Sequence, residues 1–414
     1  MKNWKLLAGV LGITMCSCSS TKTPQLLLNN AIDIARTEVV VLNKNQVQQL
    51  VPTMSEGQAF TAIDADGTAI PYQLDDLDSD GIWDEMALVV DFDAKEQKVI
   101  TVFASAKANS PQFQKYTDVH FGVGKAKPEA TEVQKYTRSY DPRDKDSLFF
   151  QMEGPAWEND KVGFRMYFDP RNGIDIFGKT TIEPTLSKQG LTTDYHTQDA
   201  WGMDILKVGT SLGAGSLAIK YQDSLYRLTG WNAARFEAIA EGPARAIFKL
   251  TYLDEFVADK SINVVHTITI EKGDWFYKSD VEIFGALDNA QIFTGIVNLK
   301  PNKAQQYITN DGTFVLESYG KQSENNDNLG MAVFLKNQLD GFPDFKADLF
   351  NPKSVNTKIT DTYYVPMPVG KKSTFFFVSG WEPSDAAFKT GVGFTATVKE
   401  SAMNVANPII VTIK

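Results

Sequence analysis

Short apolar runs separated by turn-forming residues follow one another along most of the chain. In residues 262–270 (INVVHTITI), every second side chain from Ile262 to Ile270 falls on one face of an extended strand. Comparable runs occur at residues 38–43, 86–92, 98–104, 162–168, 244–252, 275–284, 373–379 and 408–413. With Gly, Asn and Asp between them, these runs predict an all-β protein built as a sandwich or barrel. We expect helices only at residues 44–50 and around residues 395–404.

The division into domains follows from a change in composition. Residues 105–145 are rich in Lys, Pro, Ser and Asp and poor in apolar runs, which is typical of a connection between domains. We therefore expect a small N-terminal β-sandwich domain at residues 25–105, a linker at 106–145 and a large β domain at 146–414. The large part is longer than an immunoglobulin-sized module, so a super-sandwich of two large sheets is expected.

The first twenty residues (MKNWKLLAGVLGITMCSCSS) predict export. An apolar stretch follows two lysines; it has the length of a signal peptide and is too short to span a bilayer. It ends at Cys16 and Cys18, the only cysteines of the chain. This placement favours a lipoprotein signal at residues 1–18 with the lipid on Cys18, and an ordinary cleaved signal is the alternative. We expect a periplasmic protein that contacts a membrane only through this lipid, because no later apolar run is long enough to cross one.

Composition and charge narrow the classes of partner. Hydrophobic residues make up 43% and charged residues 22%, as in a globular protein with a sizeable core. Lys and Arg total 41 against 51 Asp and Glu, a net charge of −10. Nucleic acid is therefore not an expected partner, since phosphate binding needs clustered positive charge. An anionic small ligand needs only a local group of Arg and Lys.

An acidic loop at residues 76–85 (DLDSDGIWDE) is a candidate Ca²⁺ site. Asp76, Asp78 and Asp80 alternate before Gly81, and Asp84 follows, so a tight loop can direct several carboxylate oxygens at one cation. The twelfth position of an EF-hand loop would be an alanine here, and the flanking segments read as strands. The alternatives are a structural Ca²⁺ site and a solvated acidic hairpin.

Two stretches of the large domain concentrate Trp, Arg, His and carboxylates. The first is residues 153–179 and the second is residues 194–207. Strand spacing places Arg165 and Tyr167 on the same face. Each member also has a structural interpretation: the arginines as surface ion pairs, His196 as a hydrogen-bonded structural residue, and the tryptophans as core residues. The chain contains no nucleophile elbow, zinc-binding His motif, phosphate-binding loop or dinucleotide fingerprint.

Three motifs carry a resemblance to a known family: residues 71–86 (PYQLDDLDSDGIWDEM), 154–179 (GPAWENDKVGFRMYFDPRNGIDIFGK) and 194–209 (DYHTQDAWGMDILKVG). They resemble exported proteins, catalogued as a domain of unknown function, from Gram-negative bacteria that degrade complex polysaccharides. That family is similar to galactose-mutarotase-like super-sandwich proteins and to exo-acting rhamnogalacturonan lyases. The resemblance implies a galactose-mutarotase-like fold for the large domain. It also implies a dehydratase activity on uronate oligosaccharides, as in ulvan breakdown.

Elimination at a uronate removes the C5 proton and expels the oxygen at C4, and the candidate residues can be assigned to those steps. A base, an acid and a cation on the carboxylate are needed, and no cofactor is. We expect His196 to be the base and Tyr195 an alternative acid or base. Arg165 and Arg171 would hold the carboxylate. Glu153 or Glu158 would protonate the leaving group if burial raises its pKa. The expected substrate-binding residues are Trp157, Glu158, Lys179, Trp201 and Asp204.

Three functions remain open from the sequence. The first is a carbon–oxygen lyase or dehydratase acting on uronate-containing oligosaccharides. The second is a glycan-binding lipoprotein without chemistry, which keeps a Trp platform but does not need His196. The third is a sugar epimerase or mutarotase, or a glycoside hydrolase that works through Glu153 and Glu158.

Overall fold

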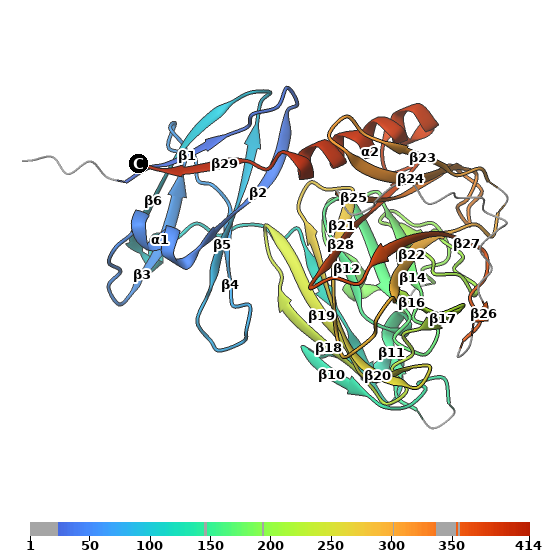
Figure 1. The fold of residues 1–414 in the computed structure, drawn as a ribbon. Coiled ribbons are helices and arrows are strands. Elements are labelled where there is room, and N and C mark those ends of the chain that lie inside the picture. The colour runs from blue at the N-terminus through green and yellow to red at the C-terminus, as the bar shows by residue number, and fades with distance from the viewer. Residues whose placement is uncertain (1–23, 145–146, 193, 301, 337–352, 355–356) are drawn as a thin grey trace, which may run out of the picture.

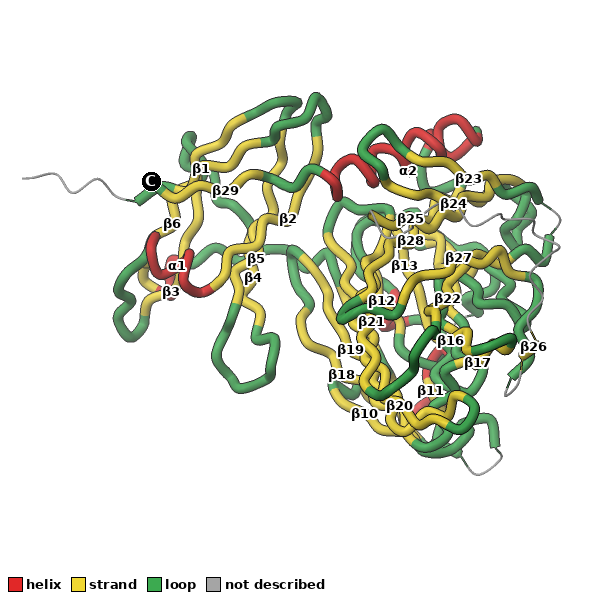
Figure 2. The backbone as a smooth tube through the Cα atoms, viewed as in Figure 1, coloured by secondary structure: helices red, strands yellow, loops and turns green. Residues whose placement is uncertain are grey.

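The computed structural model describes residues 24–144, 147–192, 194–300, 302–336, 353–354 and 357–414. Strands dominate these residues, which confirms the all-β fold class (Figures 1 and 2). A small N-terminal domain stands beside a much larger one. The expected signal segment and Cys18 lie outside the described residues. Over the described ranges, neither α-helix is both long enough and apolar enough to cross a membrane.

The small domain is a sandwich of two sheets, counted over the described residues. One sheet has the strand order β29 (Ile410–Ile413), β1 (Leu26–Asn29), β6 (Gln97–Ala106), β3 (Gln58–Ile63). The other has the order β2 (Arg36–Asn43), β5 (Glu85–Phe92), β4 (Tyr72–Asp75). Their inner faces share one apolar core with α1 (Lys44–Leu50). The helix starts where expected because Asn43 and Gln46 form a reciprocal capping box.

The last strand does not belong to the large domain, contrary to the division expected from the sequence. β29 pairs antiparallel with β1, with Leu26 opposite Ile413. The chain therefore leaves the large domain through α2 (Gly391–Ala406) and returns to the small one (Figure 1). The pairing covers an edge of β1 that would otherwise expose unpaired backbone groups. It also packs Val411 and Ile413 on the small core.

Residues 106–145 are not a plain linker either. They contain β7 (Asp118–His120), β8 (Gly122–Gly124), β9 (Thr131–Glu132) and β10 (Lys135–Arg138). β7 pairs with β12 (Ala156–Glu158), and β10 pairs with β18 (Ala233–Ala240), so this segment is part of the large domain. These strands are only two to four residues long, too short to show a periodic pattern.

Four sheets build the large domain within the described ranges. The large sheet has the order β10, β18, β19 (Arg245–Val257), β20 (Lys260–Glu271), β21 (Phe276–Phe284), β28 (Ser373–Trp381), β25 (Leu329–Lys336), β24 (Thr313–Gly320), β23 (Gln305–Ile308). The polar sheet has the order β15 (Gly202–Asp204), β14 (Ile174–Lys179), β13 (Val162–Met166), β12, β7. The third sheet has the order β26 (Lys353–Ser354), β17 (Ser224–Arg227), β16 (Ala218–Tyr221), β22 (Gln291–Val297), β27 (Thr362–Pro368). The fourth has the order β11 (Phe149–Phe150), β8, β9.

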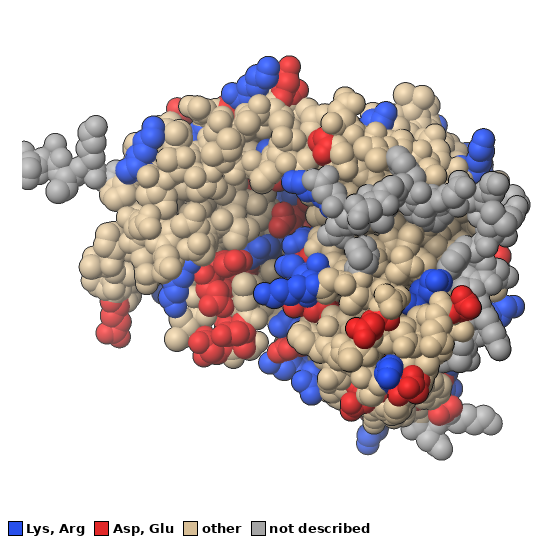
Figure 3. Space-filling view, in the orientation of Figure 1, with Lys and Arg blue, Asp and Glu red and all other residues tan. Residues whose placement is uncertain are grey.

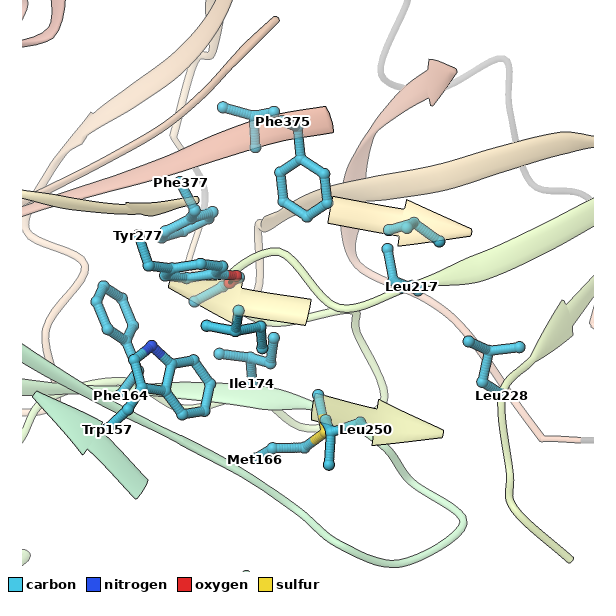
Figure 4. Close-up of a cluster of buried hydrophobic side chains, with 14 of the residues drawn as sticks. Trp157, Phe164, Met166, Ile174, Leu217, Leu228, Leu250, Tyr277, Phe375 and Phe377 are labelled. Atoms are coloured by element: carbon cyan, nitrogen blue, oxygen red, sulfur yellow. Dashed lines mark hydrogen bonds between the residues drawn. The ribbon is translucent and has the colours of Figure 1, made fainter. Parts of the chain in front are cut away.

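A continuous apolar core joins the large sheet to the polar sheet. Phe164 and Met166 of β13 point into it, and Phe164 meets Tyr277 and Phe377 of the large sheet (Figure 4). The large sheet thus supplies the rigid support on which the polar sheet rests. α2 packs on the opposite face of the large sheet through Phe394 and its neighbours.

An ion-pair network joins the two domains. Arg245 of β19 binds Asp75 (Nε–Oδ2 2.7 Å) and Glu85 (Nη2–Oε2 2.6 Å) of the small domain. Gln73 accepts the backbone N–H groups of Ala244 and Arg245. Figure 3 shows acidic side chains of the small domain facing basic ones of the large domain across a hollow between them.

Candidate functional site

The candidate site lies on the face of the polar sheet that points away from the core. Because side chains alternate along β13, Phe164 and Met166 enter the core and Arg165 takes the opposite face. Asp175 of β14 pairs directly opposite Arg165. Phe177 is the next residue after Asp175 on this face of β14, and Asp204 of β15 pairs opposite Phe177. Sheet register therefore brings together three charges that are far apart in sequence.

Arg165 is the centre of this cluster and is 2% exposed. Among the described residues its two terminal nitrogens donate to six acceptors. Nη2 donates to Asp175 Oδ2 (2.8 Å), Asp204 Oδ2 (3.1 Å) and Tyr167 Oη (3.1 Å), and Nη1 to the Met152 carbonyl (2.9 Å), Tyr195 Oη (3.2 Å) and Glu153 Oε2 (3.3 Å). Both terminal nitrogens of Arg165 are thus engaged within the protein, and only its buried Nε has no partner among the described residues. This enclosure corrects the expectation that Arg165 clamps a substrate carboxylate. Arg165 positions the residues around it.

The buried charges perturb one another. Burial, reinforced by the charge of Asp204, raises the pKa of Asp175 to about 7. Burial is the largest single influence on Arg165 and opposes its charged form, but Asp175, Asp204 and the neighbouring tyrosines together outweigh it and raise the pKa of Arg165 above its usual range. Burial also raises the pKa of Tyr167. The floor of the site therefore holds a permanent cation and a carboxyl group that titrates near neutrality.

His196 stands on the rim, directly above Asp204. Its Nδ1 lies 3.3 Å from Asp204 Oδ2, and its side chain is 62% exposed. The hydrogen bond to Asp204 raises the pKa of His196, partly offset by burial. The ring lies 4.4 Å from that of Tyr195. Since Asp204 occupies Nδ1, Nε2 is the nitrogen available to a ligand.

Arg171 and Glu153 form the opposite rim. Arg171 Nη2 lies 3.0 Å from Glu153 Oε1, and Arg171 Nε donates to both oxygens of Asp169 (3.1 and 3.0 Å). Its guanidinium lies 4.1 Å above the ring of Tyr167. The side chain is 32% exposed, and no described residue accepts from Nη1. Arg171, unlike Arg165, can therefore reach a ligand.

The backbone beneath Glu153 is strained. Met152 (φ 52°) and Glu153 (φ 64°) adopt the left-handed region, which costs non-glycine residues energy. Gly154 follows at φ 155°, and a Cβ there would lie 2.2 Å from the Met166 carbonyl oxygen. Gln151 anchors this turn through a donation from Nε2 to the Gln189 carbonyl (2.6 Å) and a contact of Oε1 with His120 Nε2 (2.8 Å). Such strain is concentrated at functional sites and here aims Glu153 at both arginines.

Three residues expected to bind substrate do not belong to this site. Trp157 is 1% exposed and packs in the core against Phe164, because its position in β12 alternates inward (Figure 4). Glu158 and Lys179 form a fully buried pair (Oε2–Nζ 2.5 Å). Glu158 also accepts the backbone N–H of Leu186 (2.6 Å), and burial raises its pKa. This pair closes the polar sheet under a loop and is structural.

The other candidates do converge. Trp201 is half-buried and packs on Phe177 (6.0 Å between ring centres), in the same small cluster as Tyr195. Asp204 touches Arg165 and His196, so it orients the histidine. The sequence did not single out Asp175 or Asp169 for a role. Recognising residues 162–179 as a hairpin would have placed Asp175 opposite Arg165.

The acidic loop joins β4 to β5, away from the polar sheet. Carboxylate oxygens of Asp76, Asp78 and Asp84 lie within 4.8 Å of one another. Asp80 is outside this group: its N–H donates to Asp76 (3.2 Å) and its own carboxylate accepts the Ile82 N–H (2.7 Å). Three converging carboxylates suit a hard cation. Ca²⁺ binding by this loop stays a prediction.

Fold and site together define an all-β, two-domain protein with an ion-paired polar sheet exposed at one rim. The chain belongs to the family described as "Domain of unknown function (DUF4861)", whose model matches residues 28–411. "Uncharacterized protein P7" of Formosa agariphila is 28% identical over 149 residues, which cover 31% of this chain and 37% of that protein.

Two solved structures from Enterococcus faecalis are similar over 94% of this chain, each with a TM-score of 0.42 and 9% identity. One is described as an alpha-mannosidase, of which 46% is covered, and the other as a glycosyl hydrolase family 38 protein, of which 47% is covered. The chain thus spans less than half the length of these proteins.

Proposed function

We propose that this protein is a carbon–oxygen lyase that acts on uronate-containing oligosaccharides from polysaccharide breakdown. It would eliminate water or a glycosyl group by removing the C5 proton and breaking the C4–O bond. The observation that carries the proposal is the His196–Asp204 pair beside Tyr195, on the rim of a site whose floor is the buried Arg165.

In this scheme His196 takes the C5 proton through Nε2. Asp204 keeps the proton of the neutral ring on Nδ1 and stabilises the imidazolium that forms. The C5–H electrons form the C4=C5 double bond as the C4–O bond breaks. Tyr195 then protonates the departing oxygen. Burial raises the pKa of Tyr195, so it holds its proton at neutral pH and can act as the acid.

The carboxylate of the substrate would be held by Arg171. Removing the C5 proton moves negative charge onto that carboxylate, and a nearby cation stabilises the charge. Arg171 is partly exposed and retains a donor group, whereas every described contact of the Arg165 terminal nitrogens is intramolecular. Trp201 is the aromatic residue available to pack on a sugar ring.

The hydrolase alternative has less support. It needs two carboxyl groups that flank a substrate bond. Glu158 is fully buried and bound to Lys179, which leaves Glu153 without the expected second carboxylate. The other alternative, a glycan-binding protein without catalytic activity, is separated from the lyase by an assay for product.

The decisive experiment is product analysis. The mature protein is incubated with oligosaccharides that contain saturated uronate residues, which keep the C5 proton and the C4 oxygen. Absorbance of the conjugated double bond is followed together with product mass. Loss of one water supports a dehydratase, and chain splitting without addition of water supports a glycan lyase. Addition of water on cleavage, or no change in any substrate, contradicts the proposal.

We also propose that the mature protein is a periplasmic lipoprotein anchored through Cys18, on the basis of the cysteines that follow the apolar N-terminal stretch. A lipid chain holds a protein at a membrane by burying its methylene groups. Cys18→Ser should move the protein to the soluble fraction, and unchanged membrane retention would contradict the anchor.

A further inference from the structure

A second polar groove lies between α2 and strands β23 and β24, on the face of the large sheet opposite the core (Figure 1). Its volume is about 650 Å³, within the range of small-molecule binding sites. It shares no lining residue with the candidate site on the polar sheet. What it can bind follows from its floor, its rim and its one aromatic wall.

The floor is organised around Glu317, which is 1% exposed. Thr395 Oγ1 donates to Glu317 Oε1 (2.5 Å), Gln305 Nε2 donates to the same oxygen, and Tyr307 Oη donates to Oε2 (2.8 Å). The buried carboxylate thus takes the hydroxyl protons of Thr395 and Tyr307 and one N–H of Gln305. The lone pairs of Thr395 Oγ1 and the Gln305 Oε1 atom therefore remain as acceptors. Such a floor is complementary to a ligand that presents hydroxyl donors.

The rim carries two lysines whose charges are not neutralised locally. Lys303 and Lys399 both line the groove, and neither forms an ion pair with a described residue. Lys399 Nζ lies 5.2 Å from the ring centre of Tyr307. With Glu317 the charge of the groove is +1, in a chain whose net charge is −10. The rim is complementary to an anionic substituent.

The wall adds an apolar surface. Tyr319 is held by a donation from its hydroxyl to the Phe388 carbonyl (2.8 Å) and by stacking on Phe394 (6.1 Å between centres). Gly391 beside it has no side chain, and Val392 is 83% exposed. A fixed aromatic ring next to hydrogen-bond acceptors suits the C–H face of a sugar.

We propose that this groove is a second binding site for an acidic oligosaccharide, separate from the candidate active site. The carboxylate or sulfate of the sugar lies between Lys303 and Lys399, its hydroxyls donate to the floor, and one ring packs on Tyr319. The proposal does not depend on the lyase activity, because binding here needs none of the residues of the polar sheet.

Calorimetric titration of the full mature protein tests the proposal. The probes are a galacturonate trisaccharide and a neutral galactose trisaccharide. Lys303→Glu with Lys399→Glu should weaken binding of the acidic probe by at least about tenfold. The double Lys→Arg variant should retain binding, and Lys125→Glu with Lys127→Glu, two exposed lysines elsewhere, is the control for net charge.

The same titration is repeated in an Arg171→Ala background to separate the two sites. The groove predicts that binding persists in this background and still depends on Lys303 and Lys399. The proposal is overturned if the acidic probe does not bind, or if the neutral probe binds equally well. It is also overturned if binding is lost with Arg171→Ala and is insensitive to the lysine reversals.

Discussion

Nη2 of Arg165 lies 2.8 Å from Oδ2 of Asp175, and the two side chains are 2% and 1% exposed. The pair is formed by direct cross-strand partners in β13 and β14, so the register of the polar sheet sets it. Every other member of the candidate site is positioned against this pair or one contact away from it. The stability of the site and its chemistry are therefore coupled.

Arg165→Met should destabilise the protein by about 3–5 kcal/mol, because it leaves Asp175 and Asp204 buried without their cation. The double variant Arg165→Met/Asp175→Asn should recover part of the loss. Urea unfolding measures both. Arg235→Met, at an exposed position of β18, is the matched control. An Arg165→Met protein as stable as that control would contradict the central role of the pair.

His196→Ala should lower turnover about a hundred- to ten-thousand-fold, as expected for loss of a positioned proton-transfer group. The melting temperature should change little, since the side chain is 62% exposed. Lys188→Ala, on an exposed side chain nearby in sequence, should leave the rate unchanged. Near-normal turnover of His196→Ala on a verified substrate would make Tyr195 the next candidate for the base.

Arg171→Ala should raise KM and lower kcat together, because a clamp on the carboxylate acts in binding and in the transition state. Arg171→Lys should recover only part of both, since lysine offers a point charge in place of a planar fork. Steady-state kinetics on a uronate oligosaccharide give both constants. If KM is unchanged in both variants, Arg171 does not bind the carboxylate.

Stability should fall as the pH rises from about 4 to 7. Asp175 and Glu38 both have a pKa raised to about 7 by burial, whereas an unfolded carboxyl group titrates near 4. The folded state thus binds protons more tightly across this window. Each group therefore lowers the free energy of unfolding by about 1.4 kcal/mol for every pH unit of increase there. Their contribution is complete below about pH 4 and is lost above about pH 7. Unfolding free energies at pH 5 and pH 8 measure it.

Asp175→Asn and Glu38→Gln should each reduce that pH dependence, because an amide does not titrate. Asp66→Asn, in an exposed turn, should leave it unchanged. A wild-type stability that is flat from pH 5 to 8 would show that neither carboxyl group holds its proton in the folded state.

Ca²⁺ should raise the melting temperature of the protein and chelator should lower it, because a cation that binds only the folded state stabilises it by mass action. Asp78→Asn should abolish the shift, since Asp76, Asp78 and Asp84 converge. Asp80→Asn should reduce it less, because that carboxylate caps the Ile82 N–H. Turnover should be unaffected, and a melting curve that ignores both Ca²⁺ and chelator would leave the loop as a solvated hairpin.

The local features were predictable because their causes lie within a few residues. The helix at residues 44–50 follows from its capping box, and the long strands follow from alternation. The dense stretches at residues 153–179 and 194–207 did supply the candidate site. Alternation along the strands did not reveal that Trp157 faces the core and Arg165 faces away from it, because the sheet's packing partner decides which face is buried.

Local pattern was sufficient to predict the all-β class, the long strands, the acidic loop and the residues from which the site is drawn. The packing of the folded chain placed β29 in the small domain and strands β7 to β10 in the large one. It alone also decided that Arg165 is enclosed while Arg171 stays accessible. These outcomes depend on pairings between residues tens to hundreds of positions apart. Such contacts are selected by shared burial and sheet register, which no local pattern encodes.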